Sequence, residues 1–266
     1  MPSLADFGFT PVIAAEIEFY LHGVDAPAAA LLFRELRQAS AMEGIGLYHI
    51  EKERGEAQYE VALTPTKSEH EAAAQTVWLK SWLSENSNHH GLKADFSAKP
   101  FTHQPGSGLH IHLHLEDEQG RNVFFKHDAL MSDPLRWSIG GLLARLPHDM
   151  PIFAPHPESY LRFEHAGEHT PATISWGANN RTCAIRLPDS KTHEKHLEHR
   201  VAGADADPVR VIEAVLAGIC YGLVERVDPP AQIYGRAGDS IYALPRLPLS
   251  LEEARKLSAS SPLPAN

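Results

Sequence analysis

The chain has 266 residues, of which 43% are hydrophobic, enough for a substantial core in one large or two small domains. Its formal net charge of -10 at pH 7 argues against nucleic acid as the main partner, because nucleic-acid-binding proteins concentrate lysine and arginine. The two cysteines, Cys183 and Cys220, indicate neither a disulfide framework nor a thiolate metal site. No apolar run reaches the ~20 residues that span a bilayer, and the start lacks a secretion-signal pattern, so we expect a cytoplasmic protein without membrane contact.

The first predicted element is a β-strand over residues 12–21, where apolar and polar side chains alternate. Because successive side chains of a strand point to opposite faces, Glu16 and Glu18 are expected to share one face. A helix is predicted next over residues 27–43, where an apolar stripe precedes Gly44.

A second acidic segment follows in residues 51–63. Gly55 permits a tight turn, so Glu53 and Glu60 are expected to converge from the two arms of a hairpin. Buried carboxylates are unfavourable unless cations neutralise them, and hard divalent metals prefer oxygen ligands with an occasional imidazole. The alternative for any one glutamate is a solvated strand charge. A capped helix is predicted next over residues 68–88.

The most informative segment is a predicted strand over residues 109–115, in which every second residue is a histidine. His110, His112 and His114 are expected on one face, and leucine and isoleucine side chains on the other. The preceding residues 106–108, Gly-Ser-Gly, supply backbone freedom and N–H groups where the chain approaches a ligand. Such a polar face is either a ligand site or a hydrogen-bonded structural surface.

Regular patterns are sparser in the second half of the chain. Helices are predicted over residues 128–146 and 208–226, and residues 258–266 are expected to form a disordered tail. Residues 147–200 show little periodicity and contain many arginines and histidines, and irregular segments of this length are usually functional loops or disordered. No repeat or interdomain linker is evident, so we expect a single domain over residues 1–266.

Arginines in and beside that irregular segment complement the glutamates in charge. Their side chains form bidentate contacts with carboxylates and phosphates. Carboxylates for metals, arginines for anions and a glycine-rich loop together describe a site for phosphoryl transfer, which depends on positioning and charge neutralisation. The candidate arginines are Arg162, Arg181, Arg186 and Arg200.

Seven motifs occur in the order found in one known family. They are AAEIEFYL, ERGEAQYE, ADFSAKPF with PGSGLHIHLHL, SYLRFE, NNRTCAIRLP, LEHRVAGADADP and YALPRLPLSLEEA. On these motifs, which cover about residues 8–258, the chain resembles the catalytic domain of the glutamine synthetases, most closely the γ-glutamylpolyamine synthetase branch. The resemblance implies an α+β fold with a curved antiparallel sheet flanked by helices.

The same resemblance implies a site for two or three Mg²⁺ or Mn²⁺ ions, with ATP as co-substrate and glutamate as substrate. It assigns one metal to Glu18, Glu53 and Glu60, and a second metal to Glu16, His110 and Glu198. It assigns ATP to His112 and Arg186, and glutamate to Gly106, Arg162 and Arg200. The implied catalytic residues are Arg181, which serves the phosphorylated intermediate, and Glu168, a flap residue that deprotonates the amine.

The implied reaction has two steps. The γ-carboxylate of glutamate, or of a related acid, attacks the γ-phosphate of ATP, and ammonia or an amine then displaces phosphate to leave an amide. Carboxylate activation is required because hydroxide is too poor a leaving group.

Several features depart from the family pattern. An N-terminal β-grasp domain and a C-terminal helical segment, both usual in the family, are missing, so we do not expect the usual dodecamer. The expected protein partner is a second copy of the chain, in a homo-oligomer other than the dodecamer, or a full-length homologue. Within the site, His196 stands where a phosphate-contacting arginine is expected, and Lys191 or Lys195 is a candidate substitute.

Three functions follow from these observations. The first is an ATP- and metal-dependent carboxylate–amine ligase. The second is a non-catalytic nucleotide- or glutamate-binding protein that regulates or completes a full-length relative. The third is a metal hydrolase built on the histidine row, although catalytic zinc usually takes histidine ligands with an open water position, whereas this set is mostly carboxylate.

Overall fold

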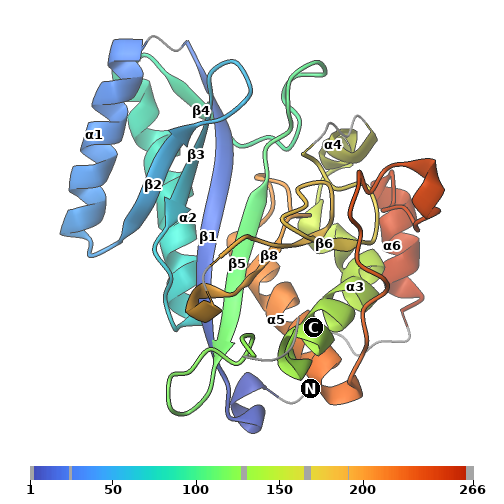
Figure 1. Cartoon of the computed structure of the whole chain (residues 1–266). Coiled ribbons are helices and arrows are strands. Elements are labelled where there is room, and N and C mark those ends of the chain that lie inside the picture. Colours follow the sequence, from blue (N-terminus) through green and yellow to red (C-terminus); the bar gives the residue numbers. More distant parts are fainter. Residues whose placement is uncertain (1–2, 24–25, 127–130, 165–168, 191, 262–266) are drawn as a thin grey trace.

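A computed structural model describes the chain except for residues 1–2, 24–25, 127–130, 165–168, 191 and 262–266. Its centre is an eight-stranded sheet. The strands are β1 (Thr10–His22), β2 (Leu47–Lys52), β3 (Gln58–Leu63), β4 (Lys93–Asp95), β5 (Leu109–Glu116), β6 (Trp176–Ala178), β7 (Ile185–Leu187) and β8 (Leu197–His199). Their order is β2-β3-β1-β5-β8-β7-β6, and β4 pairs with β1 (Figure 1). The two longest strands, β1 and β5, therefore lie side by side at the centre.

Helices cover one face of this sheet, as Figure 1 shows for α2 and α5. The α-helices are α1 (Ala26–Met42), α2 (Glu69–Asn86), α3 (Asp133–Phe153), α4 (Leu161–Glu164), α5 (Pro208–Glu225) and α6 (Leu251–Ala259). Short 3₁₀ helices occur at Leu4–Phe7, Ser87–His90, Pro157–Tyr160, Thr192–Glu194 and Ser240–Tyr242. Among the described residues, none of these helices has the length and apolar character required to cross a membrane.

The alternation predicted for β1 and β5 is confirmed. Ile13 and Ile17 of β1 and Ile111 of β5 are fully buried in the core between the sheet and the helices. In the antiparallel pairing of these strands, Glu16 lies opposite His110 on the other face. The apolar side of each strand is thus buried by helices, and the polar side is left to form a site.

The fold class is confirmed as an α+β sheet flanked by helices. All pairs between named strands are antiparallel except β6 and β7, which run parallel, so the sheet is mixed rather than wholly antiparallel. The prediction that residues 147–200 are irregular is wrong in part, because β6, β7 and β8 lie there and complete the sheet. Each of these strands has three residues, which is too short for an alternation pattern to emerge.

The helix predicted over residues 128–146 has different ends in the structure. It begins after Ser132, whose hydroxyl accepts a hydrogen bond from the backbone N–H of Leu135, and it continues through Pro147 and Pro151. A proline inside a helix costs about 3 kcal/mol because its ring removes one hydrogen bond and clashes with the preceding turn. Packing of α3 against α5 and α6 offsets this cost.

The predicted tail at residues 258–266 starts too early. The helix α6 begins after Ser250, whose side chain accepts a hydrogen bond from the N–H of Glu253, and it includes Ser258 and Ala259. Apolar burial of Ala254 anchors this helix, and the residues from 262 onward lie outside the described part.

Candidate active site

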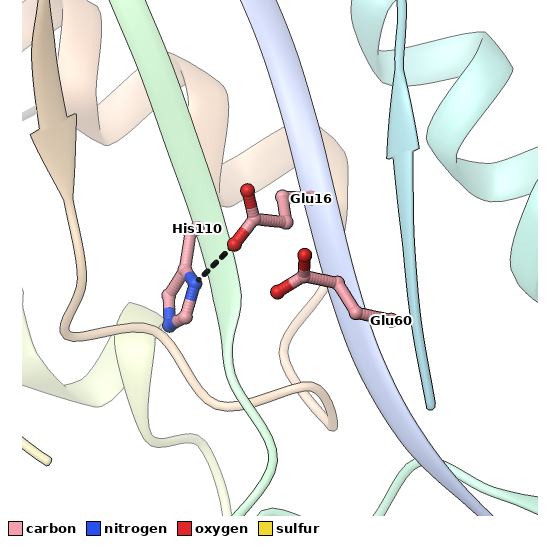
Figure 2. Close-up of side chains that lie close together, drawn as sticks. All are labelled: Glu16, Glu60 and His110. Carbon is pink, nitrogen blue, oxygen red and sulfur yellow. Dashed lines mark hydrogen bonds and ion pairs between the residues drawn. The ribbon is translucent and has the colours of Figure 1, made fainter. Parts of the chain in front are cut away.

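Glutamates and histidines from separate strands meet on the polar face of the sheet, as Figure 2 shows for three of them. Strand alternation directs those on β1 and β5 to this face. The six residues expected to bind metals lie on β1 (Glu16 and Glu18), at the β2–β3 turn (Glu53), on β3 (Glu60), on β5 (His110) and on β8 (Glu198). The structure brings all six into one neighbourhood.

Three overlapping groups of side chains are arranged as cation ligands. Within each group, one donor atom from every residue lies within 4.8 Å of the others. The groups are Glu18, Glu53 and Glu60; Glu16, Glu60 and His110; and Glu16, His112 and Glu198. The first group has the composition that the family resemblance implies for one metal.

The second predicted set also lies together, with one addition. His110 Nδ1 is 3.1 Å from Glu16 Oε1 and 3.7 Å from Glu198 Oε1. His112, which the resemblance assigns to ATP, lies equally near, with its Nε2 3.1 Å from Glu16 Oε2 and 3.8 Å from Glu198 Oε1. The geometry therefore adds His112 to the side chains that could bind a cation.

The glutamates differ sharply in their electrostatic environments. Burial and the adjacent Glu16 carboxylate raise the pKa of Glu60 to about 11, so Glu60 carries a proton at neutral pH. Burial also favours the neutral form of Glu16, but hydrogen bonds with His110 and His112 outweigh it and lower the pKa of Glu16. Carboxylates crowded in this way, with imidazoles beside them, form a donor set that fits a hard divalent cation.

Glu198 is held as an anion by two arginines. Burial favours its neutral form, but the charges of Arg200, His112 and His110 together outweigh burial and lower the pKa of Glu198 to about 2. Arg200 contacts Oε1 of this carboxylate, and Arg186 Nη1 donates to Oε2 over 2.8 Å. These two contacts therefore fix the orientation of the Glu198 carboxylate among the other expected cation ligands.

Arg162 is buried beside the same site. It donates from Nη1 to the carbonyl oxygen of Val201 over 2.7 Å and from Nη2 to that of Arg200 over 3.2 Å. Burial lowers its pKa to about 10, which leaves the guanidinium charged at neutral pH. A charged group desolvated to this extent attracts an anion strongly.

A cavity of about 520 Å³ opens beside the cation ligands. Its lining combines carboxylates with guanidinium groups and includes the glycine-rich loop. The predicted residues in this lining are Glu18, Glu53, Gly106, His110, Arg162, Arg181 and Arg200. A larger cavity of about 900 Å³, lined in part by Arg210 and Cys220, lies elsewhere and contains none of the predicted site residues. The chemistry therefore favours the smaller cavity.

The glycine-rich loop serves packing rather than backbone freedom. Neither Gly106 nor Gly108 has a positive φ. A Cβ on Gly108 would lie 2.4 Å from His110 Nε2, and one on Gly106 would lie 2.8 Å from Cγ of Arg162. Glycine at these positions lets the backbone approach the site, where the N–H of Gly108 donates to Glu18 over 2.7 Å.

Some residues of the site were not predicted. His49 Nε2 lies 2.9 Å from Glu60 Oε1. The hairpin pairs Glu51 with Glu60, and His49 lies two residues from Glu51 and therefore on the same face, which is the signal that could have indicated this contact. Asn179 accepts a hydrogen bond from Arg186 Nη2 over 2.8 Å. Its position between short strands left no signal in the sequence.

Other predicted residues lie apart from the cluster or fall outside the part of the chain that the structure describes. His114 shares the face of His112, but its Nε2 lies 3.6 Å from Glu116 Oε1. Glu168 and Lys191 fall outside the described residues.

Known proteins share this arrangement of strands and helices. Residues 23–263 match the sequence model of the glutamine synthetase catalytic domain. The γ-glutamylputrescine synthetase PuuA of Escherichia coli is 30% identical over 257 residues, which are 86% of this chain and 54% of PuuA. The γ-glutamylethanolamide synthetase GlnA4 of Streptomyces coelicolor is 29% identical over 98% of this chain and 60% of GlnA4. The chain thus spans little more than half the length of these relatives.

A solved structure of a GmaS/ADP complex superposes with a TM-score of 0.84 at 23% identity, over 97% of this chain and 65% of GmaS. GmaS without ligand gives a TM-score of 0.85 at 24% identity. These superpositions support the fold. The match over residues 23–263 shows that the chain belongs to the glutamine synthetase family and corresponds to its catalytic domain.

Proposed function

We propose that this chain is a single catalytic domain over residues 1–266 that couples glutamate, or a related acid, to ammonia or an amine, with ATP and a divalent cation. The relatives PuuA and GlnA4 are named as synthetases of γ-glutamylputrescine and γ-glutamylethanolamide, which supports the coupling of glutamate to an amine. The observation that carries the proposal is one cavity that joins carboxylate cation ligands to buried arginines. A substrate with several negative charges would find both neutralising elements there.

The cation ligands have one chemical role in this proposal. Mg²⁺ or Mn²⁺, when bound, neutralises phosphate oxygens so that they can approach a carboxylate nucleophile. Two groups centred on Glu60 and one centred on Glu198 would hold two or three such ions. The protonated Glu60 would release its proton as the cation binds, since metal ligands act in their deprotonated form.

The arginines and the glycine-rich loop would position the substrates. Arg162 and Arg200 would bind the carboxylates of glutamate, and Gly106 would contact it through the backbone. Arg181 would neutralise the phosphorylated intermediate. Arg186, already oriented by Glu198, would serve the phosphates of ATP.

Atoms and charges balance in two steps. A γ-carboxylate oxygen of glutamate forms a bond to the γ-phosphorus as the bond to ADP breaks. The amine nitrogen then attacks the acyl carbon, inorganic phosphate leaves, and the amine proton passes to a carboxylate, for which Glu168 is the proposed acceptor. Fixing the two reactants in one pocket supplies much of the acceleration.

A phosphate-release assay with ATP, Mn²⁺, glutamate and a panel of amines tests this proposal. Amine-dependent phosphate release, with the matching amide detected by mass spectrometry, is the expected result. Glu198→Gln is expected to abolish release, and Glu252→Gln on the exposed face of α6 is the matched control. Phosphate release without any amide would instead indicate a simple ATP hydrolase.

Calorimetry separates the two remaining functions. ATP and Mn²⁺ binding to folded protein without turnover of any amine would favour a non-catalytic binding protein, and turnover restored by a full-length relative would favour a partner role. Strong preference for Zn²⁺ over Mn²⁺ would favour a metal hydrolase. A homo-oligomer other than the usual dodecamer and a cytoplasmic location stay predictions from the sequence.

A further inference from the structure

Two histidines form a line of hydrogen bonds that ends at the cation ligands. His196, which lies just before β8, places its Nε2 3.1 Å from Nδ1 of His112. On its other side, His196 Nδ1 lies 2.7 Å from the backbone carbonyl oxygen of Glu194. His112 Nε2 then points toward Glu16 Oε2 over 3.1 Å and toward Glu198 Oε1 over 3.8 Å.

The carbonyl at one end fixes the hydrogen positions along this line. A carbonyl oxygen only accepts hydrogen bonds, so His196 must carry its hydrogen on Nδ1. The Nε2 of a neutral His196 is then an acceptor, and the facing Nδ1 of His112 must be the donor. A neutral His112 consequently directs the lone pair of its Nε2 toward the carboxylates.

Other arrangements of neutral rings leave worse conflicts. With the hydrogen of His112 on Nε2, two lone pairs would face each other across the 3.1 Å contact between the rings. With the hydrogen of His196 on Nε2, the carbonyl of Glu194 would face a lone pair over 2.7 Å. The arrangement fixed by the carbonyl has one conflict, between His112 Nε2 and the carboxylate oxygens. In the cation-free protein a second hydrogen on Nε2, donated to Glu16, removes it, and a divalent cation that replaces this hydrogen removes it equally while the hydrogen on Nδ1 stays in place.

We propose that His196 is a positioning residue that holds His112 in the tautomer with its hydrogen on Nδ1, so that Nε2 joins Glu16 and Glu198 as a cation ligand. This inference rests on the cation dependence in the proposed function. Residues that orient a metal-bound histidine through its second ring nitrogen commonly change metal affinity by about 10–100-fold. His196 thus gains a defined role at a position where the family resemblance leads one to expect an arginine.

Packing around the two rings supports a fixed geometry. The His112 side chain is 20% exposed, and its ring centroid lies 5.2 Å from that of His196 at an interplanar angle of 47°. Arg186 and Arg200 contact the two oxygens of Glu198, so this carboxylate cannot turn away from His112. The cation ligands are therefore oriented from both sides.

Substitutions of His196 separate a hydrogen-bonding role from a packing role. His196→Leu removes the acceptor that faces His112 Nδ1, whereas His196→Gln can supply an amide oxygen there. The matched control is His193→Leu, three residues away, because the His193 side chain is 75% exposed. Circular dichroism and urea unfolding verify that each variant is folded.

Manganese binding is measured by electron paramagnetic resonance titration. We expect His196→Leu to weaken one class of Mn²⁺ sites by about 10–100-fold, while His196→Gln and the control stay within about threefold of the unsubstituted chain. Equal loss in the leucine and glutamine variants, or no loss in either, would overturn the inference. This measurement does not depend on turnover, so an inactive protein that still binds Mn²⁺ would refute the ligase proposal alone.

Nitrogen-15 NMR of the unsubstituted chain with Mg²⁺ provides a second test that requires no variant. The expected spectrum places the His112 hydrogen on Nδ1 and a metal-shifted resonance on Nε2. A hydrogen on Nε2 in the Mg²⁺-loaded protein would refute the inference even if His196→Leu failed to fold. If the protein binds neither Mn²⁺ nor Mg²⁺, both this inference and the cation dependence of the proposed function fall.

Discussion

Glutamine at position 60 or 198 is the same chemical change in two opposite electrostatic environments. Glu60 has a pKa raised to about 11 by burial and Glu16, so the amide of Glu60→Gln replaces a carboxyl group that is already neutral. In the cation-free protein, we expect Glu60→Gln to change the free energy of unfolding by less than about 1 kcal/mol, as for a near-isosteric change that keeps a partner for His49.

Glu198→Gln should behave differently without cations. The pKa of Glu198 is lowered to about 2, because Arg200 and the neighbouring histidines together outweigh burial, so the substitution removes a buried anion and leaves the arginine charge uncompensated. Loss of one partner of a buried ion pair typically costs about 3–5 kcal/mol. The two variants should therefore differ by several kcal/mol in cation-free buffer.

Adding Mn²⁺ should reveal a cost of Glu60→Gln that is absent without cations, because Glu60 belongs to two of the three ligand groups. A cation at 100 times its Kd stabilises the folded state by about 2.7 kcal/mol, and a 100-fold weaker site at the same concentration gives about 0.4 kcal/mol. Glu60→Gln should thus lose about 2.3 kcal/mol of cation stabilisation, or about 5–9 °C in Tm.

Urea unfolding followed by tryptophan fluorescence measures the free energy of unfolding of both variants, each with and without Mn²⁺. Glu252→Gln on the surface of α6 is the control for a generic change in charge. Equal destabilisation of the two site variants in cation-free buffer would refute the assignment of a neutral Glu60 and an ionised Glu198. Full Mn²⁺ stabilisation of Glu60→Gln would refute its role as a ligand.

Three further predictions concern the surrounding structure. Gly55→Ala places a Cβ 2.2 Å from the hydroxyl of Tyr20 and should cost about 1–3 kcal/mol in urea unfolding, with part of the loss restored by Tyr20→Phe; strictly additive effects would contradict this explanation. Burial lowers the pKa of His199 from 6.5 to about 3, so in this pH range the unfolded chain binds a proton at His199 that the folded chain does not. The free energy of unfolding therefore decreases as the pH is lowered through 6.5. Between about pH 7.5 and about pH 5.5 the expected loss is about 1.4 kcal/mol, and an unchanged pH slope in His199→Gln would refute it. Lys67→Ala removes a surface ion pair with Glu116 and should change unfolding by less than about 1 kcal/mol; a larger loss would show that this pair is not solvent-screened.

Strand periodicity predicted the orientation of the ligands better than their partners. Alternation along β1 and β5 placed Glu16, Glu18 and His110 on the polar face, because a period of two fixes direction within a strand. It could not predict which strands pair. The register that sets Glu16 opposite His110, and Glu18 opposite Glu60, depends on packing of the whole sheet.

Other features were hidden from the sequence for physical reasons. The strands β6–β8 are stabilised by their neighbours in the sheet, so three residues each suffice and leave no periodic pattern. Pro147 signals a helix end locally, yet tertiary packing carries α3 past it. The contact between His112 and His196 links β5 to the residue before β8, and these two strands meet only in the folded chain.

Pairing of β1 with β5 also constrains how the protein matures during synthesis. Its central ladder links the first strand of the chain to one that leaves the ribosome much later, and such non-local contacts form slowly. Once β5 has been synthesised, the nascent chain contains Glu16, Glu60 and His110, whereas Glu198 and Arg200 are synthesised only later, with β8 and the residue after it. Until then the acidic residues repel one another, so cellular Mg²⁺ would favour productive collapse over premature aggregation of the unpaired central strands.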